Sequence, residues 1–419
     1  MKKLLAILMA VCLMIPAIAV GAQAEEQKTV TVWCWDPAFN VYAMEEAAKI
    51  YEAANPNVNI EVVNIESGDI ETIQTTSFMS GDVSALPDVI LMQDNSGQKF
   101  LSSFSQYYLP LDDYIDYTQF ASYKVANFTF DGQSYAVPFD NGASAMFLRT
   151  DILAEAGYTL EDVTNVTWDE LIEIGKVVKE KTGKYLLSTS AGYSDFVMMM
   201  VQSMGTWFFD ENGDPQINTE PFVEVVNQVV RLAQSGIVYE GVDWPDYISG
   251  FQSGNCAGTV NGCWIMASIV LAEDQSGLWG MTTTPRLNLE TSVNYSNQGG
   301  SSWLVVRGPE EKEAADFLAK TFAGSVELYQ TILPTSSAIA TYLPAAGGEA
   351  YTIEHPFFAG QKIFEDLLDY AANIPVVNYG VYNYEARDAI NEAVQEVLNG
   401  ADAQSALDTA QENLEFEME

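Results

Sequence analysis

Short apolar runs alternate with amphipathic stretches along the chain, and this alternation predicts strands that are each followed by a helix. Residues 29–35 are rich in β-branched and aromatic side chains, as is typical of a strand. Asn40 then stands at the place of a helix N-cap. The helix after it carries apolar residues along one face, namely Met44, Ala47, Ala48 and Tyr51. Residues 58–63 indicate a second strand, and the apolar run 88–92 indicates a parallel strand buried on both faces. Such alternation predicts βαβ units and a mainly parallel sheet.

The middle and the end of the chain continue the pattern with further helices. Thr167 and Glu170 form a capping box that opens a helix, and Gly183 is suited to end it. Other amphipathic helices are expected over residues 222–234, from Pro309 onward, over 386–398 and over 405–414. No internal repeat and no Gly/Ser linker separates these segments, so two domains are expected between which the chain crosses more than once.

Residues 1–24 have the pattern of an export signal. Lys2 and Lys3 give a basic start, residues 4–15 are apolar, and residues 22–24 offer small side chains for cleavage. Pro16 breaks the apolar run, which argues against a retained membrane anchor. No later stretch approaches the roughly 18 apolar residues of a membrane-spanning helix. We therefore expect an exported protein, periplasmic or extracellular at the cell surface.

The cysteines predict neither a lipid anchor nor a disulfide. Cys12 lies too early in the apolar run to be a lipidation cysteine, so none is apparent. Cys256 and Cys263 bracket an expected strand, whose extended length of about 23 Å is far beyond disulfide reach. With Cys34, they are expected to be three buried thiols.

Composition and charge narrow the class of protein. The 419 residues are 48% apolar and 12% aromatic, which suits a globular protein of two or three domains. The 58 acidic residues outnumber the 18 basic ones, for a formal charge of −40. Because such a surface repels phosphates, no nucleic-acid partner is expected. Cleavage of the signal removes two lysines, so this acidity belongs to the mature protein, which we expect to be a monomer.

Metal and triad chemistry find little support in the sequence. His355 is the only histidine, which excludes any metal site that needs two imidazoles. A Ser-His-Asp triad would have to use it, and no G-x-S-x-G motif accompanies it, so a structural or exposed role is expected. Residues 210–214 resemble the start of a calcium loop, but Pro215 and Pro221 stand where that loop needs glycine and glutamate. A polar turn is the expected structure there, and no metal or cofactor is predicted.

Polar and aromatic residues converge just after four expected strands, at residues 35–40, 93–95, 140–142 and 262–264. In open α/β sheets, ligands bind beyond the carboxyl ends of the strands. Sugars need this combination, because the apolar face of a sugar ring stacks on tryptophan while its hydroxyls pair with carboxylates and amides. Two such stacks and a few charged hydrogen bonds are enough for micromolar affinity.

The tryptophans are expected to differ in role. Trp35 adjoins Asp36 at a strand exit, and Trp264 follows a glycine that allows close approach, so both are candidate ligand contacts. Trp207 suits either a ligand contact or a core position. The remaining ones considered indicate core positions: Trp33, Trp168 and Trp303.

The same segments resemble family 1 of the bacterial extracellular solute-binding proteins, the sugar-binding subunits of ABC importers. The similarity runs over nearly all of the mature chain and is most specific in VWCWDPAFN from residue 32, LPDVILMQD from 86, VPFDNG from 137, VNGCW from 260 and NQGGSSW from 297. Within the family the chain looks most like the lactose- and arabinose-type proteins.

The resemblance implies a two-lobed α/β fold, periplasmic-binding-protein-like, in which each lobe is a mainly parallel sheet flanked by helices. Lobe 1 would comprise residues 25–138 and about 286–336, and lobe 2 about 139–285 and about 337–419. Three crossings join the lobes, a mono- or oligosaccharide binds in the cleft between them, and the closed form delivers it to the membrane permease.

The resemblance also implies roles for particular residues. Trp264 stacks on sugar, Asp94 and Asn95 bind hydroxyls, and an aromatic side chain from residues 377–382 joins the cleft, with the tyrosine left open. Together with the residues at the strand exits, the expected ligand-binding set is Trp35, Asp36, Phe39, Asp94, Asn95, Asp140, Asn141, Trp207, Trp264, Gln298, Gly299, Gly300, Tyr379 and Tyr382.

The leading hypothesis is therefore a non-catalytic carbohydrate-binding protein for import. A secreted glycoside hydrolase is the first alternative, with two of Asp36, Asp94 and Asp140 as its catalytic pair at a separation of roughly 5 to 9.5 Å. Neighbouring amides, which lower the pKa of an acid, and the whole-chain resemblance argue against it. An exported structural or adhesive protein is the second alternative.

Overall fold

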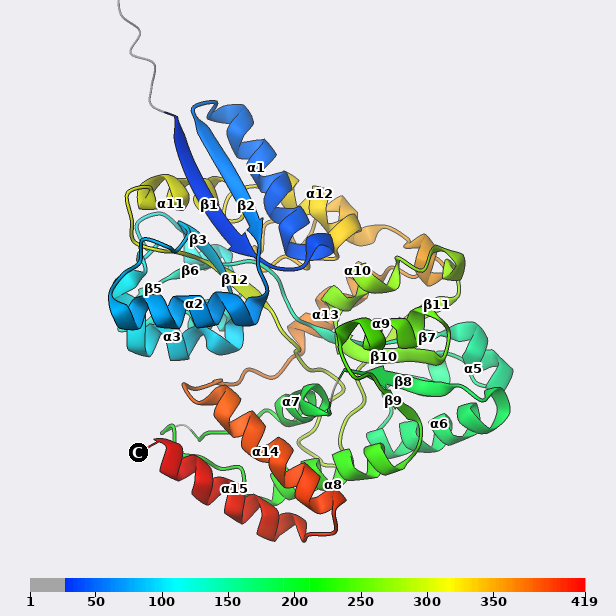
Figure 1. The fold of residues 1–419 in the computed structure, drawn as a ribbon. Helices are drawn as coiled ribbons and strands as arrows, with labels where there is room; N and C mark the ends of the chain where they lie inside the picture. Colours follow the sequence, from blue (N-terminus) through cyan, green and yellow to red (C-terminus); the bar gives the residue numbers. More distant parts are fainter. Residues whose placement is uncertain (1–26, 191, 211, 419) are drawn as a thin grey trace, which may run out of the picture.

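The computed structural model describes residues 27–190, 192–210 and 212–418 (Figure 1). The export signal expected over residues 1–24 lies outside the described residues. Within them, no helix combines the length and the apolar character needed to cross a membrane.

The first of two five-stranded sheets has the strand order β2-β1-β3-β12-β6. Its strands are β1 (Lys28–Cys34), β2 (Val58–Asn64), β3 (Val89–Gln93), β6 (Ala136–Pro138) and β12 (Ser301–Val305). Its helices are α1 (Tyr42–Ala54), α2 (Ser67–Ser80), α3 (Gly97–Phe104), α4 (Ser122–Asn127), α11 (Glu311–Lys320) and α12 (Val326–Ser336), with a small hairpin of β4 (Thr129–Phe130) and β5 (Gln133–Ser134). The apolar residues of α1, α11 and α12 pack on one face of this sheet, and those of α2 and α3 pack on the other.

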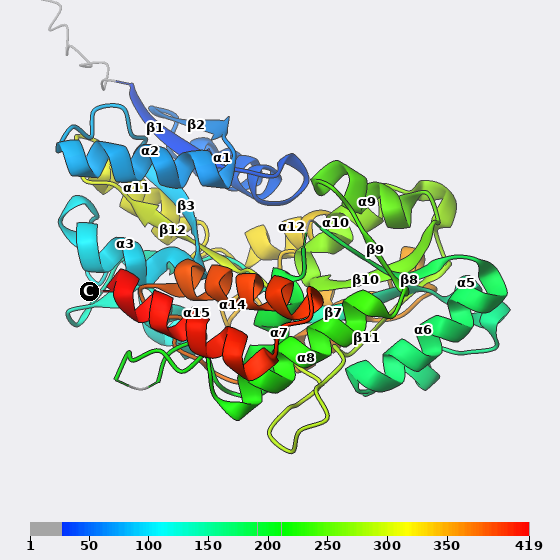
Figure 2. The same cartoon turned by 60° about the horizontal axis from the view of Figure 1, so that its bottom comes forward.

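The second sheet has the order β11-β7-β10-β8-β9. Its strands are β7 (Ser144–Arg149), β8 (Tyr185–Thr189), β9 (Val238–Glu240), β10 (Cys256–Gly262) and β11 (Trp279–Thr282). On one face lie α9 (Trp244–Gln252), α10 (Met266–Ile269) and α13 (Ile363–Ala372). On the other lie α5 (Thr150–Ala156), α6 (Trp168–Thr182), α7 (Ser194–Ser203), α8 (Glu220–Gln234), α14 (Asn383–Leu398) and α15 (Ala403–Met418). Figure 2 shows α14, α15 and α8 packed beside one another.

The two-lobed α/β fold with mainly parallel sheets is confirmed, and in each sheet one strand, β12 in the first and β7 in the second, runs opposite to the other four. In the first sheet β1 pairs in parallel with β2 and β3, while β12 runs antiparallel to β3 and β6. In the second, β7 runs antiparallel to β10 and β11. The chain enters β7 from the first sheet, after β6, and it enters β12 from the second sheet, after β11. A βαβ crossover within one sheet imposes parallel pairing, and a strand that arrives from elsewhere is free of that constraint.

Several local predictions are confirmed. The capping box of Thr167 and Glu170 opens α6, and Gly183 ends it in the left-handed conformation. The predicted face of α1 is buried, with Met44, Ala47, Ala48 and Tyr51 all inside the core. Cys34, Cys256 and Cys263 are free and buried, as predicted.

The cap of the first helix is different from the predicted one. Asp36, and not Asn40, begins the helical segment: its carboxylate accepts the amide of Ala38 at 3.0 Å, and a π-helical turn over Pro37–Val41 leads into α1. Asn40 lies one turn later and is buried. Asp36 caps the helix in place of Asn40 because the first backbone amides of the helical segment, which have no partner within the helix, lie next to Asp36.

The chain passes between the two sheets after β6, after β11 and after α12. These passages lie side by side, since Asp140 pairs with Ala340 and Ala143 pairs with Asn297 in isolated bridges. Ahead of the second passage, the Val293 amide donates to the Ser203 carbonyl of α7 at 2.9 Å. The lobe boundaries near residues 138, 286 and 336 stay predictions.

Candidate ligand-binding site

A cleft of about 770 Å³ lies between the two sheets, at the carboxyl ends of β1, β2, β3, β6 and β10. Its size falls within the roughly 300–1,000 Å³ of sites that enclose small organic ligands. Residues from both lobes line it, and its place agrees with the rule that ligands bind beyond the carboxyl ends of the strands in open α/β folds. Of the fourteen predicted site residues, eleven line the cleft: Trp35, Asp36, Phe39, Asn95, Asp140, Trp207, Trp264, Gln298, Gly299, Gly300 and Tyr379.

The segment after β1 forms one wall of the cleft. Trp35 is half-buried there, and Asp36 follows it with a φ of 54°. Burial raises the pKa of Asp36, the charge of Glu66 adds to this, and the amides of Ala38 and Phe39 oppose it. The wall thus offers an indole face beside a carboxylate, both positioned by the start of α1.

A glycine turn that enters β12 forms the floor of the cleft. Gly299 and Gly300 both have positive φ values, of 83° and 93°. A Cβ on Gly300 would lie 2.8 Å from Asp94 Oδ2 and 3.0 Å from Lys124 Nζ, so a side chain does not fit. Glycine therefore lets the backbone lie directly on the charged pair beneath it.

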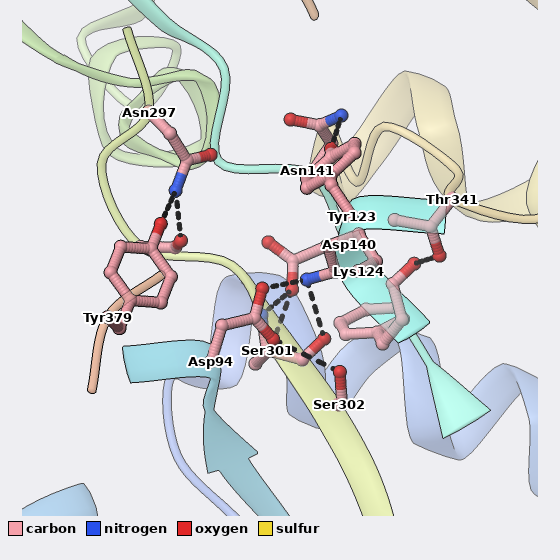
Figure 3. A network of polar contacts seen from close by, with 12 residues as sticks. Asp94, Tyr123, Lys124, Asp140, Asn141, Asn297, Ser301, Ser302, Thr341 and Tyr379 are labelled. Atoms are coloured by element: carbon pink, nitrogen blue, oxygen red, sulfur yellow. Dashed lines mark hydrogen bonds and ion pairs between the residues drawn. The ribbon is translucent and has the colours of Figure 1, made fainter. Parts of the chain in front are cut away.

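That charged pair belongs to a buried network under the floor (Figure 3). Lys124 forms an ion pair with Asp94, and both side chains are almost completely buried. The lysine also donates to the Ser301 carbonyl at 3.3 Å, while the Ser302 hydroxyl donates to Asp94 Oδ1 at 3.1 Å. Asp140 joins from the first passage, where its Oδ1 accepts the Ser301 amide at 2.8 Å and the Ser301 hydroxyl at 2.6 Å.

The network corrects the role predicted for Asp94. This carboxylate does not line the cleft, because Lys124 and Ser302 already occupy it. It supports the floor instead of presenting itself to a ligand. Asp140 does line the cleft, and burial raises its pKa to about 6. The charge of Lys124 and the hydrogen bonds from Ser301 oppose that rise, and the charge of Asp94 adds to it.

Asn141 also supports the site from outside the lining. Its amide group donates to the Tyr123 hydroxyl, and its Oδ1 accepts the Ala143 amide at 2.9 Å. Its backbone amide donates to the Ile339 carbonyl at 2.9 Å, which ties the first passage to the third. The side chain is therefore committed to holding the passages together.

Trp264 stands on the opposite wall, just after β10. Its Nε1 donates to the Gln298 carbonyl at 2.9 Å, which fixes the indole against the glycine turn. A Cβ on Gly262 would lie 2.3 Å from that same nitrogen, and one on Gly299 would lie 3.0 Å from it. The two glycines thus make room for the indole.

Trp207 and Tyr379 meet deeper in the cleft. Their ring centroids are 4.9 Å apart at 72°, an edge-to-face contact. Trp207 Nε1 donates to Asn383 Oδ1 at 2.8 Å, and Asn297 Nδ2 donates to the Tyr379 hydroxyl at 3.1 Å. Of the two tyrosines left open by the sequence, Tyr379 lines the cleft and Tyr382 does not.

Sequence reasoning missed several residues of the lining: Glu66, Asp195, Gln202, Trp244, Tyr384 and Arg387. Asp195 has the same signal as the others, a carboxylate shortly after a strand, and burial raises its pKa against the opposing effects of Gln298 and Arg387. Tyr384 lies on α14, far along the chain, and its hydroxyl bonds Gln93 Oε1 at 2.8 Å and Asn95 Oδ1 at 3.0 Å. No local pattern marks such a residue.

The arrangement suits binding of a neutral, hydroxyl-rich molecule. Indole faces offer apolar contact, and carboxylates and amides offer hydrogen bonds beside them. Across residues 27–190, 192–210 and 212–418, no cluster of three or more His, Cys, Asp or Glu side chains is placed to hold a metal ion.

The chain is similar to several known proteins. The sequence profile described as "Bacterial extracellular solute-binding protein" matches residues 46–352. The lactose-binding protein of Rhizobium radiobacter is 38% identical over 384 residues, which cover 90% of each chain. The arabinooligosaccharide-binding protein of Halalkalibacterium halodurans is 26% identical and covers 80% of this chain and 78% of its own. The solved structure of the GacH receptor of Streptomyces glaucescens shares the fold, with a TM-score of 0.77, 20% identity and coverage of 93% of this chain and 98% of that one.

Proposed function

Because the chain belongs to the family of bacterial extracellular solute-binding proteins, which are not enzymes, we propose that it captures a mono- or oligosaccharide for an ABC importer. The alternative function, a secreted glycoside hydrolase, is set aside because the proteins of this family are not enzymes. Proteins of this family are extracellular or periplasmic and work with permease subunits. We include in the proposal the cleavable export signal, the absence of a lipid anchor and a monomeric state.

The observation that carries the proposal is the pairing of indole faces with hydroxyl-binding groups in one cleft. Trp35 and Trp264 stand on different walls, with Asp36 and Asp140 among the carboxylates around them. Covering a sugar face of roughly 100 Å² on an indole contributes about 2.5 kcal/mol at about 25 cal/mol per Å². Charged hydrogen bonds to the ring hydroxyls add the directional part of the recognition.

The names of the relatives support the same ligand class. Curated relatives bind lactose and arabinooligosaccharides, and the GacH structure was solved with acarbose and an acarbose homologue. Within the cleft, we propose that Trp264 is the main stacking face and that Asp36, Asn95 and Asp140 bind hydroxyls. The chain crosses between the sheets three times, and joints of this kind support a closing motion over the bound sugar.

Calorimetry and thermal unfolding test the proposal on the purified exported protein. Lactose, arabinotriose and maltotriose are titrated separately, and the sugars are analysed afterwards by chromatography. We expect saturable binding of at least one sugar and its recovery intact. A ligand at 100 times its Kd should raise the unfolding free energy by roughly 2.7 kcal/mol. No stabilisation by any of the three, or turnover of one of them, would contradict the proposal.

A further inference from the structure

Trp244 is a second indole on the wall of Trp264, placed where the cleft meets solvent. It is the first residue of α9, it lines the cleft, and 42% of its surface is exposed. Three other tryptophans, Trp168, Trp279 and Trp303, are at most 1% exposed. Tryptophan suits a ligand contact there, because it offers a large apolar face together with an N–H donor.

The local structure holds Trp244 in place before any ligand arrives. Asp243 caps α9 by accepting the Asp246 amide at 2.9 Å. The Trp244 ring packs on the Tyr247 ring with centroids 5.1 Å apart, and the buried Tyr247 hydroxyl accepts from Asn261 Nδ2 at 2.8 Å. A ring positioned in this way loses little conformational freedom when a ligand covers it.

The two indoles form a continuous aromatic wall. The ring centroids of Trp244 and Trp264 are 5.8 Å apart, and the rings are inclined by 31°. Trp264 is tied inward to the glycine turn by its bond to Gln298, whereas Trp244 lies on the solvent side. Successive rings of an oligosaccharide also lie next to one another, so one sugar ring can contact each indole.

Two further residues of the lining suit the same ligand. Ser268 lines the cleft and carries a hydroxyl for hydrogen bonding. Leu271 also lines it, with 66% of its surface exposed. The lining here thus combines apolar contact with a neutral polar group.

From these observations we propose that Trp244 forms an outer sugar subsite. The ligand is then an oligosaccharide with one ring against Trp264 and the next ring against Trp244. This inference rests on the proposed function, because it assigns the chain length of the ligand within the same cleft. It also makes Trp244 a determinant of affinity for disaccharides and longer sugars but not for monosaccharides.

Affinity as a function of sugar length tests the inference. Isothermal titration is run with galactose, lactose and a galactosyl-lactose trisaccharide, and with arabinose, arabinobiose and arabinotriose. We expect the unmodified protein to prefer the longer members of the series that it binds. Trp244→Ala should weaken binding of those members by about tenfold and leave the monosaccharide affinity within about twofold. Trp244→Phe should keep most of the preference.

The matched control is Val242→Ala, which removes an apolar side chain that is 80% exposed two residues earlier and does not line the cleft. It should change no affinity. A second measurement requires no substitution of the ring: with 5-fluorotryptophan incorporated, the Trp244 resonance should shift with the disaccharide and not with the monosaccharide. The Trp244→Phe spectrum assigns that resonance.

The outcomes separate the inference from the function on which it rests. If no saccharide of either series binds the unmodified protein, the proposed function fails. If saccharides bind but mono- and disaccharide affinities are equal, or Trp244→Ala leaves the length preference unchanged, the outer subsite is wrong. A Trp244 resonance that stays in place when the disaccharide saturates the protein also overturns it.

Discussion

Replacing Lys124 by methionine tests whether the buried network under the cleft supports the fold. The lysine is 1% exposed and is the cation that faces the carboxylates of Asp94 and Asp140. Methionine keeps a comparable length and apolar volume but removes the charge. The variant therefore leaves two neighbouring carboxylates in the protein interior with no countercharge.

The expected loss follows from the desolvation of those carboxylates. Breaking a buried ion pair by removing one partner costs about 3–5 kcal/mol, because the remaining charge stays buried and unpaired. Lys124 also lowers the pKa of Asp140, so without it that pKa rises above its present value of about 6. Protonation of the carboxylates near pH 5 then removes part of the penalty. The destabilisation should be larger at pH 7 than at pH 5.

Urea unfolding followed by tryptophan fluorescence measures both effects. The free energies of unfolding of the unmodified protein and of Lys124→Met are compared at pH 7 and at pH 5. The control is Lys124→Met combined with Asp94→Asn, which removes one of the stranded charges and should recover about half of the loss. A loss below about 1 kcal/mol at pH 7, or an equal loss at both pH values, would refute this reasoning about the network.

Two further substitutions test the cleft itself. Trp264→Ala should abolish measurable sugar binding in calorimetry while the melting temperature falls only slightly, and unchanged affinity in the folded variant would show that the stacking face lies elsewhere. Asp140→Asn should flatten the dependence of stability on pH. The pKa of Asp140 is about 6 in the folded protein and about 3.9 in the unfolded chain, so the folded protein binds more protons between these two pH values. The free energy of unfolding of the unmodified protein therefore falls by roughly 3 kcal/mol as the pH rises from about 3.9 to about 6. Unfolding curves of both proteins at pH 4 and pH 7 measure the difference, and an equal slope in the Asn variant would contradict the assignment.

The rule that ligands bind beyond the carboxyl ends of the strands correctly predicted the site residues whose position depends on one strand and the turn after it. Trp35, Asp36 and Trp264 follow β1 and β10 directly, and a short segment of sequence is enough to place them. The two-lobed fold could likewise be predicted, because alternating strands and helices and the family resemblance point the same way. The antiparallel pairs could not, since they depend on the route by which the chain returns from the other sheet.

The misplaced and missed residues depend on partners far away in the sequence. Asp94 carries a carboxylate suited to ligand contact, but Lys124, thirty residues later, pairs with this carboxylate, which therefore supports the floor of the cleft instead. Arg387 and Tyr384 reach the cleft on a C-terminal helix whose amphipathic pattern gives no sign of it. Trp244 lies at the start of a helix and not at the end of a strand, so a search of the carboxyl ends of the strands does not identify it.

The network under the floor links ligand binding to the joints between the sheets. Asp140 belongs to the first passage and bonds Ser301, which ends the second, while the backbone of Asp140 pairs with Ala340 in the third. Lys124 holds the carbonyl of Ser301 from below, and the glycine turn above it carries the Gln298 carbonyl that fixes Trp264. A change in the relative position of the sheets therefore moves the same backbone that positions the stacking face. Substitution of Lys124, which does not line the cleft, should consequently alter sugar affinity, and this effect should follow the effect on the passages rather than any loss of contact.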